Sequence, residues 1–418
     1  MKRSTFLAPA ILLVTTALAK AVVRPSSNQL FRKGYGGTVI DIPLTLSTKN
    51  DGKTDLQWYA KISVGTPPQT FNVLVDTGSP TLLLPLSNCT TCGSQTLFDP
   101  SESSTFSWAP GEFYEYDFGT GGDTLPASGP VTARCAFATD SVGIQGLTVS
   151  TYEFVLCDME DPQFSAQPNI DGILGFPTQP NPDKGLEWAL YDAGLLASPL
   201  FGLYTPPGQV NGAQLTLGGL DETKYDGEIS FVDLDVLTAE KPFWVMDIQT
   251  IFIDGEQLQI TTNNSTAQVG YPQALSILDS GTAYLSAPEY SIARDIYATI
   301  SPKIYQIDPA GSWGAPCSDL DAITSEVTFL FGYDGATQTN VTIAGKSLNL
   351  GPYPGMDGIC QAAINNWLYP EVNRDDGRGV WTIGSPLLKQ YYTAWNGQDL
   401  QVGFAPLKAT SSSEPHEC

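Results

Sequence analysis

The sequence of 418 residues has one histidine, His416, and only 15% charged residues. A single histidine excludes a Ser-His-Asp triad, a Cys-His pair and a zinc site of several histidines from the body of the chain. Acid–base chemistry would therefore fall to carboxylates, tyrosines, lysines or a cofactor. Basic residues are also scarce, because 20 Lys and Arg stand against 44 Asp and Glu, for a net charge of −24. This charge repels phosphate backbones, which excludes nucleic acid as a partner, and it suits secretion into an acidic environment.

Long apolar runs are absent after residue 19. The run from Phe6 to Ala19 follows Lys2 and Arg3, and it is shorter than the ~20 residues that span a bilayer, which disfavours a membrane anchor. Its small-x-small ending predicts a secretory signal peptide over residues 1–19. We expect a secreted, extracellular protein without membrane association after signal removal, with a vacuolar location as the alternative.

The two ends of the chain differ in composition from the middle. Residues 20–45 are basic, with Lys20, Arg24, Arg32 and Lys33. Two interpretations stay open: a short propeptide that covers an acidic cleft until its removal, or a solvated N-terminal extension. The Ser-rich residues 409–418 predict a disordered tail.

Glycine and proline are abundant, at 40 and 31 residues, and helical periodicity is scarce. Short β-branched and aromatic runs between turn residues predict an all-β protein, with strands at 58–64, 70–75, 147–156, 214–217, 228–232 and 244–253. Short helices are expected at 185–193 and 288–300. The length suits two domains better than one.

An internal repeat is the most informative feature of the sequence. Residues 71–80 resemble residues 275–283, because an apolar run precedes Asp76-Thr-Gly-Ser in the first and Asp279-Ser-Gly-Thr in the second. In both copies a leucine follows six residues after the Asp and a proline nine residues after it. Similar segments also recur downstream, where Gly175 lies 99 residues after Asp76 and Gly384 lies 105 after Asp279. One unit with two landmarks therefore occurs twice.

Two such Asp residues, each at the end of an apolar strand, would face each other across a pseudo-twofold axis. Gly78 and Gly281 allow a tight turn with backbone N–H groups near the carboxylates, and the hydroxyls of Thr77 and Ser280 can tie each loop to its neighbour. Carboxylates this close share a proton, so one acts as base and one as acid on a single water molecule. Two Asp residues that only cap turns, or the unequal carboxylates of a glycosidase, fit a symmetric duplication less well.

The sequence resembles the pepsin-like aspartic peptidases, of the secreted fungal type, over roughly residues 56–407. The match rests on both Asp motifs and on the segments 58–69, 217–221, 381–384, 391–393 and 402–405. The resemblance implies a bilobal pepsin-like fold, with two pseudo-twofold-related β lobes around a central cleft, spanning residues 46–206 and 207–408. It implies a monomeric aspartic endopeptidase that uses no cofactor or metal. Such an enzyme cleaves extended peptides or proteins at acid pH, beside large hydrophobic residues.

The residues that carry this chemistry follow from the matched motifs. Catalysis falls to Asp76 and Asp279, and support of the pair falls to Thr77, Gly78, Ser79, Ser280, Gly281 and Thr282. A non-catalytic binding or inhibitory protein on the same scaffold is the rival. It typically loses a catalytic Asp or Gly, and this chain keeps both.

Residues 116–121 resemble the tip of the hairpin flap that closes over the peptide, which implies Tyr116, Phe118, Gly119 and Thr120 as flap or substrate-binding residues. The family's flap Tyr is Phe118 here, and its Trp seven residues after the first Asp is Leu83. Because both polar partners are missing together, we predict an apolar contact between Phe118 and Leu83. Tyr116 lies on the same strand face and is the alternative flap tyrosine. An acidic flap tip widens specificity to basic residues in some fungal relatives, and Thr120 argues against that here.

Seven cysteines accompany the predicted secretion, which makes disulfides the default. Cys135 and Cys157 flank residues 143–146 almost symmetrically, so a hairpin turn would place them opposite each other. The family resemblance implies Cys317–Cys360 and Cys89–Cys92, with a zinc or redox role as the alternative for the second pair. Cys418 is left over, either in a disordered or trimmed tail or in an intermolecular disulfide. Sequons mark candidate glycosylation sites at Asn88, Asn263, Asn264 and Asn340.

Overall fold

The computed structural model describes residues 37–47, 55–119, 131–165, 169–178, 185–235, 242–258, 274–333, 337–366 and 379–408. All of them belong to one compact unit that begins at Tyr35. The predictions for the signal peptide, the first part of the basic extension, Thr120, Asn263, Asn264 and the tail fall outside these residues. In the described part of the chain, no helix is long and apolar enough to cross a membrane.

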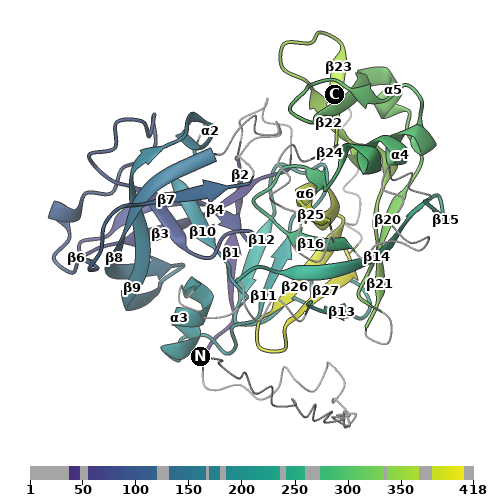
Figure 1. The fold of residues 1–418 in the computed structure, drawn as a ribbon. Coiled ribbons are helices and arrows are strands. Elements are labelled where there is room, and N and C mark those ends of the chain that lie inside the picture. The colour runs from purple at the N-terminus through teal and green to yellow at the C-terminus, as the bar shows by residue number, and fades with distance from the viewer. Residues whose placement is uncertain are drawn as a thin grey trace, which may run out of the picture. The chain divides into compact units, whose positions relative to one another are not determined.

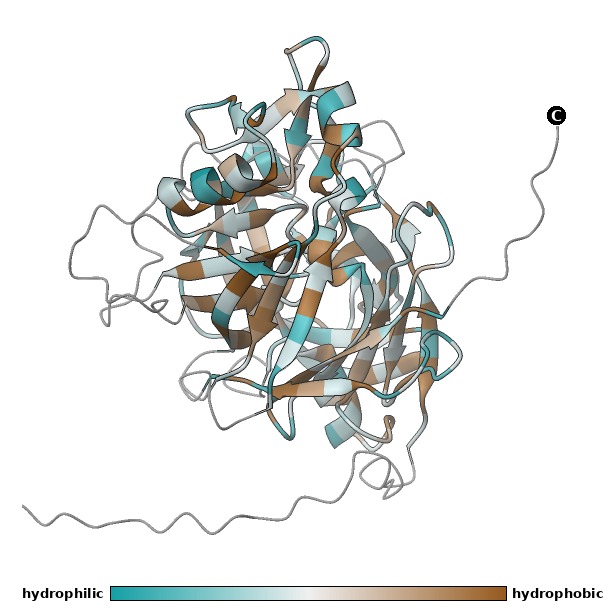
Figure 2. Ribbon diagram, turned by 90° about the vertical axis from the view of Figure 1, so that its right-hand side faces the viewer, coloured by the Kyte–Doolittle hydropathy of each residue, from teal (hydrophilic) through white to brown (hydrophobic). Residues whose placement is uncertain are grey.

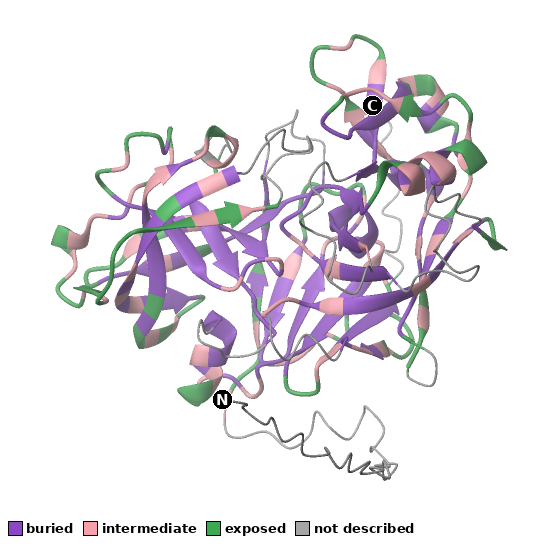
Figure 3. Ribbon diagram, in the orientation of Figure 1, coloured by how far each residue is buried: buried purple, intermediate pink, exposed green. Residues whose placement is uncertain are grey.

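The described residues are mainly β-structure, which confirms the predicted all-β class (Figure 1). The predicted strands are present as β3 (Trp58–Val64), β4 (Gln69–Asp76), β9 (Leu147–Glu160), β12 (Gln214–Leu217), β13 (Ser230–Asp233) and β14 (Val245–Ile253). Buried residues line these strands, whereas exposed residues gather on the connecting turns (Figure 3). Hydropathy follows the same division, with hydrophobic residues along the strands (Figure 2).

A nine-stranded sheet forms the first half of the fold. Its order is β2 (Thr45–Leu46), β3, β4, β10 (Gly172–Gly175), β5 (Leu82–Pro85), β9, β8 (Val131–Ile144) and β6 (Ser107–Trp108), with β7 (Tyr114–Phe118) also on β8. An eight-stranded sheet forms the second half. Its order is β21 (Thr339–Ile343), β20 (Val327–Phe331), β14, β16 (Ala274–Leu278), β25 (Val380–Ile383), β17 (Leu285–Ala287) and β24 (Ile364–Asn366), with β15 (Glu256–Gln257) on β14.

The internal repeat appears as the same strand arrangement in both sheets. Strand β10 runs parallel to β4 and antiparallel to β5. Strand β25 likewise runs parallel to β16 and antiparallel to β17. In each repeat, the strand before the Asp motif and the strand of the downstream glycine segment are thus neighbours in the sheet. This duplicated arrangement is the bilobal pepsin-like fold.

A six-stranded sheet takes strands from both halves of the chain. Its order is β1 (Ile40–Pro43), β12, β11 (Phe201–Tyr204), β26 (Tyr391–Asn396), β27 (Gln401–Pro406) and β13. Strand β1 lies within residues 20–45, and it pairs with β12 so that Ile40 is opposite Leu217. The end of the basic segment is therefore built into this sheet as an edge strand.

A four-stranded sheet and short helices complete the described fold. The sheet contains β18 (Tyr305–Gln306), β19 (Trp313–Pro316), β23 (Ile359–Ala362) and β22 (Asn349–Pro352). The α-helices are α2 (Pro162–Ser165), α3 (Leu186–Asp192), α4 (Tyr290–Ile300), α5 (Cys317–Asp321) and α6 (Ser385–Leu388). Both predicted helices are present, but α4 begins two residues after Pro288, because Glu289 is still extended, with φ −143° and ψ 149°. Gly194, with φ +72°, follows α3 as expected of a residue that ends a helix.

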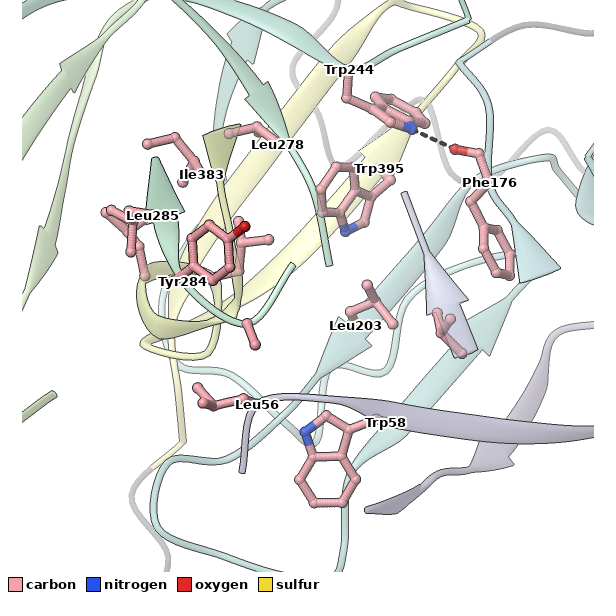
Figure 4. Packing of buried hydrophobic residues seen from close by; sticks show 14 of the residues in the cluster. Leu56, Trp58, Phe176, Leu203, Trp244, Leu278, Tyr284, Leu285, Ile383 and Trp395 are labelled. Atoms are coloured by element: carbon pink, nitrogen blue, oxygen red, sulfur yellow. Dashed lines mark hydrogen bonds between the residues drawn. The ribbon is translucent and has the colours of Figure 1, made fainter. Parts of the chain in front are cut away.

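Aromatic residues tie the six-stranded sheet to the first half of the chain (Figure 4). Trp395 stacks on Phe201 with ring centres 5.8 Å apart, and Trp244 meets Trp395 edge-on at 5.2 Å. Trp244 Nε1 donates a hydrogen bond to the carbonyl of Phe176 at 2.7 Å. Phe176 N in turn donates to the backbone carbonyl of Asp76 at 2.9 Å. This core therefore reaches the first Asp motif within two hydrogen bonds.

The structure contains the three disulfides that the sequence predicts: Cys89–Cys92, Cys135–Cys157 and Cys317–Cys360. Cys135 and Cys157 lie directly opposite each other on β8 and β9, which a turn at residues 145–146 connects. Of the four sequons, Asn88 and Asn340 lie in the described residues, and both are exposed.

Candidate active site

The two motif aspartates lie at equivalent ends of equivalent strands. Asp76 is the last residue of β4, and Asp279 directly follows β16. Beside them, β10 places Gly175 opposite Asp76, and β25 places Ile383 opposite Leu278. Both aspartates line one pocket, which has a volume of 370 Å³. Residues more than 200 positions apart in the chain therefore meet at one site.

Four hydrogen bonds cross between the two loops in a symmetric pattern. Thr77 Oγ1 donates to the carbonyl of Leu278 at 2.9 Å and accepts a bond from Ser280 N at 2.9 Å. Ser280 Oγ donates to the carbonyl of Val75 at 2.8 Å and accepts a bond from Thr77 N at 3.1 Å. Each hydroxyl thus serves as donor and acceptor toward the opposite loop, and the two strand ends are held together.

Each carboxyl group also accepts hydrogen bonds from its own loop, from backbone N–H groups and from one hydroxyl. Asp76 accepts two, from Gly78 N at 2.8 Å and Ser79 Oγ at 2.5 Å. Asp279 accepts three, from Gly281 N at 2.8 Å, Thr282 N at 3.1 Å and Thr282 Oγ1 at 2.6 Å. All six residues that the sequence predicts to support the pair therefore surround it in this structure.

The glycines of the two motifs allow the carboxyl groups to approach each other. A Cβ atom on Gly78 would overlap the carboxyl group of Asp279, and one on Gly281 would overlap that of Asp76. Each glycine thus lies against the carboxyl group of the other loop, and no larger residue fits in either place without moving it.

Electrostatics distinguish this pair from two ordinary surface aspartates. Burial and the negative charge of Asp279 raise the pKa of Asp76 well above its usual value, and the hydrogen bond from Ser79 opposes this effect. A carboxyl group with a raised pKa keeps its proton in acid solution. The arrangement can therefore present one protonated and one ionised carboxyl group to a molecule between them.

The predicted flap strand packs over a small apolar cluster beside the aspartates. Phe118 and Tyr116, both on β7, are partly buried against a cluster that includes Leu83 and Cys135. Phe118 also meets the ring of Phe164 edge-on, with centres 4.6 Å apart. The Cys135–Cys157 disulfide belongs to the same cluster. The predicted exchange of a polar flap base for an apolar one matches this packing.

Several residues near the site were not predicted. Gln57 Nε2 donates to the carbonyl of Gly281 at 2.8 Å. Asp55 forms a buried ion pair with Lys389 at 2.6 Å and accepts a bond from Gly208 N at 2.5 Å, which joins α6 to the segment between β11 and β12. Their partners are more than 150 positions away, so no local pattern could have identified them.

Glu160 is a further residue of the site that the sequence did not predict. It is 2% exposed and lines the same pocket as the aspartates, together with Gln95. In the sequence it stands among Asp158 and Asp161 and cannot be distinguished from a solvated acidic turn.

Comparison with known proteins decides the family. The sequence profile of the family described as "Eukaryotic aspartyl protease" matches residues 57–407. The chain belongs to the eukaryotic aspartyl protease family. Among its relatives, cathepsin E of Aquarana catesbeiana is 28% identical, with 87% of this chain and 83% of the relative aligned. Pepsin-2B of Gadus morhua is 29% identical, with 87% of this chain and 99% of the relative aligned. Pepsin A of Sus scrofa is 27% identical, with 84% and 82% aligned.

Family membership makes this aspartyl protease a hydrolase of the endopeptidase type that acts on peptides or proteins. Both halves of the duplicated site lie inside the matched range. The aspartyl protease match also covers the flap strand, although Phe118 and Leu83 replace the expected polar pair.

Proposed function

We propose that the chain is a secreted aspartic endopeptidase in which Asp76 and Asp279 hydrolyse peptide bonds at acid pH. The observation that carries this proposal is the contact between the two carboxyl groups, in which burial and the charge of Asp279 raise the pKa of Asp76. The basic segment at 20–45, the predicted signal peptide and the acidic composition support secretion as an inactive precursor into an acidic environment.

The ionised carboxyl group accepts a proton from a water molecule as the water oxygen forms a bond to the amide carbon. The protonated carboxyl group donates its proton to the carbonyl oxygen, which gives a tetrahedral diol. The C–N bond then breaks as the nitrogen takes a proton from one carboxyl group and the other removes a proton from a diol hydroxyl. The crossed bonds of Thr77 and Ser280 keep the carboxyl groups in place through both steps.

The substrate binds as an extended chain beneath the flap, with large hydrophobic residues beside the cut. Support comes from the apolar side chains in the pocket around the pair, among them Leu74, Leu83, Phe118, Ile173 and Ile277. Apolar surface of this kind favours an apolar or aromatic side chain over a small polar one.

The test is hydrolysis of denatured haemoglobin by the purified, acidified protein, with and without a statine-type inhibitor. We expect cleavage that the inhibitor blocks, with a bell-shaped pH profile on the acid side, because activity is lost once Asp76 ionises and both carboxyl groups are charged. Asp76→Asn and Asp279→Asn should each abolish activity. Asp226→Asn, a change at an exposed aspartate, serves as the matched control. Substantial turnover in either dyad variant, at any pH, contradicts the mechanism.

A further inference from the structure

The loop of the second aspartate has one hydrogen-bond donor that the loop of the first aspartate lacks. Thr282 N donates to Asp279 Oδ1 at 3.1 Å, and the same N–H is shared with the backbone carbonyl of Asp279 at 3.3 Å. In the described part of the first loop, the equivalent Ser79 N makes no such bond to Asp76. The loops therefore support their two carboxyl groups unequally.

A buried side chain from the first half of the chain holds the peptide group that supplies this extra donor. Gln57 directly precedes β3 and is 6% exposed, and its Nε2 donates to the carbonyl of Gly281 at 2.8 Å. This carbonyl and the N–H of Thr282 are the two ends of one peptide group. Only the amide nitrogen of a glutamine can donate to a carbonyl oxygen, which fixes the orientation of the side chain. A chain of hydrogen bonds thus runs from Gln57 through one peptide group to Asp279.

The internal repeat explains why the first loop has no equivalent support. In both halves, the strand that precedes the aspartate strand pairs with it in the same antiparallel register: Tyr59 opposite Leu74, and Val245 opposite Ile277. Leu74 and Ile277 each stand two residues before their aspartate, so the position equivalent to Gln57 is Phe243. Phenylalanine has no polar hydrogen to donate, and no side chain among the described residues donates to the carbonyl of Gly78.

This chain of bonds favours the ionised form of Asp279. Each N–H that donates to a carboxylate stabilises its charge. A peptide group that already accepts a hydrogen bond at its carbonyl is polarised, so its N–H becomes a stronger donor. Gln57 also keeps this peptide group from turning its N–H away from the carboxyl group, because such a turn would leave the Gly281 carbonyl without its partner.

We propose that Gln57 is a positioning residue of the peptidase reaction, which holds the peptide group between Gly281 and Thr282 against Asp279 and favours the ionised form of this carboxyl group. The inference rests on the proposed function and adds to it the order of proton transfer. Asp279 takes a proton from the water molecule as the water oxygen bonds to the amide carbon. Asp76 gives its proton to the carbonyl oxygen, so the diol forms with the proton moved from Asp76 to Asp279 in net effect.

No charged group around Asp279 replaces this support. The pocket has four further titratable groups, and none is a cation: Asp76, Tyr116, Asp117 and Glu160. Of the strands beside β16, β25 has no titratable residue, and β14 contributes Asp247, which lies opposite Leu275. Asp55, two residues before Gln57, is paired with Lys389 at 2.6 Å. No lysine or arginine of the described chain pairs with Asp279, so its charge depends on hydrogen bonds.

The experiment compares the pH profiles of kcat/KM for wild type, Gln57→Met, Gln57→Glu and Gln69→Met, on one peptide with hydrophobic residues at the cut. Methionine has nearly the length of glutamine but no donor, whereas glutamic acid still donates while it is protonated. Gln69→Met is the matched control, because Gln69 Nε2 also donates to a backbone carbonyl, that of Asp99, at 2.8 Å. Gln69 lies at the opposite end of β4 from Asp76.

In Gln57→Met, we expect the acid limb of the profile to move up by about 0.5 pH unit, because two or three N–H donors together lower the pKa of a carboxylate by about 2 units. Below that limb kcat/KM falls about threefold, and the alkaline limb stays in place. Gln57→Glu should keep the wild-type acid limb and lose activity on the alkaline side instead. There the introduced carboxyl group ionises, loses its donor and repels Asp279. Gln69→Met should follow wild type on both sides.

A merely structural role of Gln57 gives a different result. If Gln57→Met lowers kcat/KM by one factor at every pH, or if Gln57→Glu moves the acid limb as Gln57→Met does, the inference is overturned. Cleavage of the peptide by wild type then leaves the proposed peptidase function intact. If Gln57→Met does not fold, the two limbs of Gln57→Glu decide alone. If wild type does not cleave the peptide, the proposed function fails, and the inference fails with it.

Discussion

Replacing Thr77 with valine tests whether the crossed hydrogen bonds hold the two aspartates together. Thr77 is fully buried, and its hydroxyl donates to Leu278 O and accepts from Ser280 N, each at 2.9 Å. Valine has nearly the same shape, so Thr77→Val leaves no large cavity but removes both bonds. Each buried group left without a partner costs about 1–3 kcal/mol, so the variant should lose roughly 2–6 kcal/mol of unfolding free energy.

The assay separates stability from catalysis. Urea unfolding is followed by tryptophan fluorescence in an Asp279→Asn background, in which the protein does not digest itself. Activity is measured in the background with both aspartates. Because a displacement of about 1 Å in a catalytic group can cost about 100-fold in rate, we expect kcat to fall by about that factor and KM to change little.

A matched control comes from another buried threonine. Thr250 is 8% exposed, and its hydroxyl has no partner among the described residues. Thr250→Val should therefore change the unfolding free energy by less than about 0.5 kcal/mol or stabilise the protein. If Thr77→Val costs no more than the control and leaves kcat unchanged, the crossed bonds do not organise the site.

Three further predictions address pH, the flap and the disulfide. Because burial raises the pKa of Glu160 from 4.5 to about 7, this side chain alone should contribute a loss of about 3 kcal/mol of unfolding free energy as pH increases from 4.5 to 7. Urea unfolding of Glu160→Gln should lack this loss, and equal slopes for both proteins would contradict it. Phe118→Tyr and Leu83→Trp should be non-additive in kcat/KM, with a coupling of at least about 0.5 kcal/mol in a double-mutant cycle; additive effects would mean that they are not neighbours. Replacing both Cys135 and Cys157 with alanine should cost about 2–4 kcal/mol in urea unfolding, and a free thiol at either position in non-reducing peptide mapping would refute the β8–β9 register.

Residues 20–45 form one segment by their charge, but the structure places the end of this segment in a β-sheet. Its charge sets residues 20–45 apart from the acidic chain, but charge does not report backbone pairing. In the structure Ile40–Pro43 forms β1 at the edge of the six-stranded sheet, opposite β12. This pairing depends on a strand more than 170 residues away, so the composition of residues 20–45 does not predict it.

The sequence by itself determined the all-β class, the duplicated unit and the disulfide between β8 and β9. These features are recorded in local order: alternating apolar runs, two Asp-x-Gly motifs with matched flanks, and two cysteines almost equidistant from one turn. Only the tertiary structure decided which oxygen bonds which amide between the loops at Thr77 and Ser280, and that Lys389 is buried against Asp55. Only the tertiary structure showed that Glu160 is buried, whereas its acidic neighbours Asp158 and Asp161 are partly exposed. The physical reason is that a side chain becomes buried, or pairs with a distant residue, only when strands from separate parts of the chain pack together. The spacing of residues along the sequence therefore does not predict these contacts.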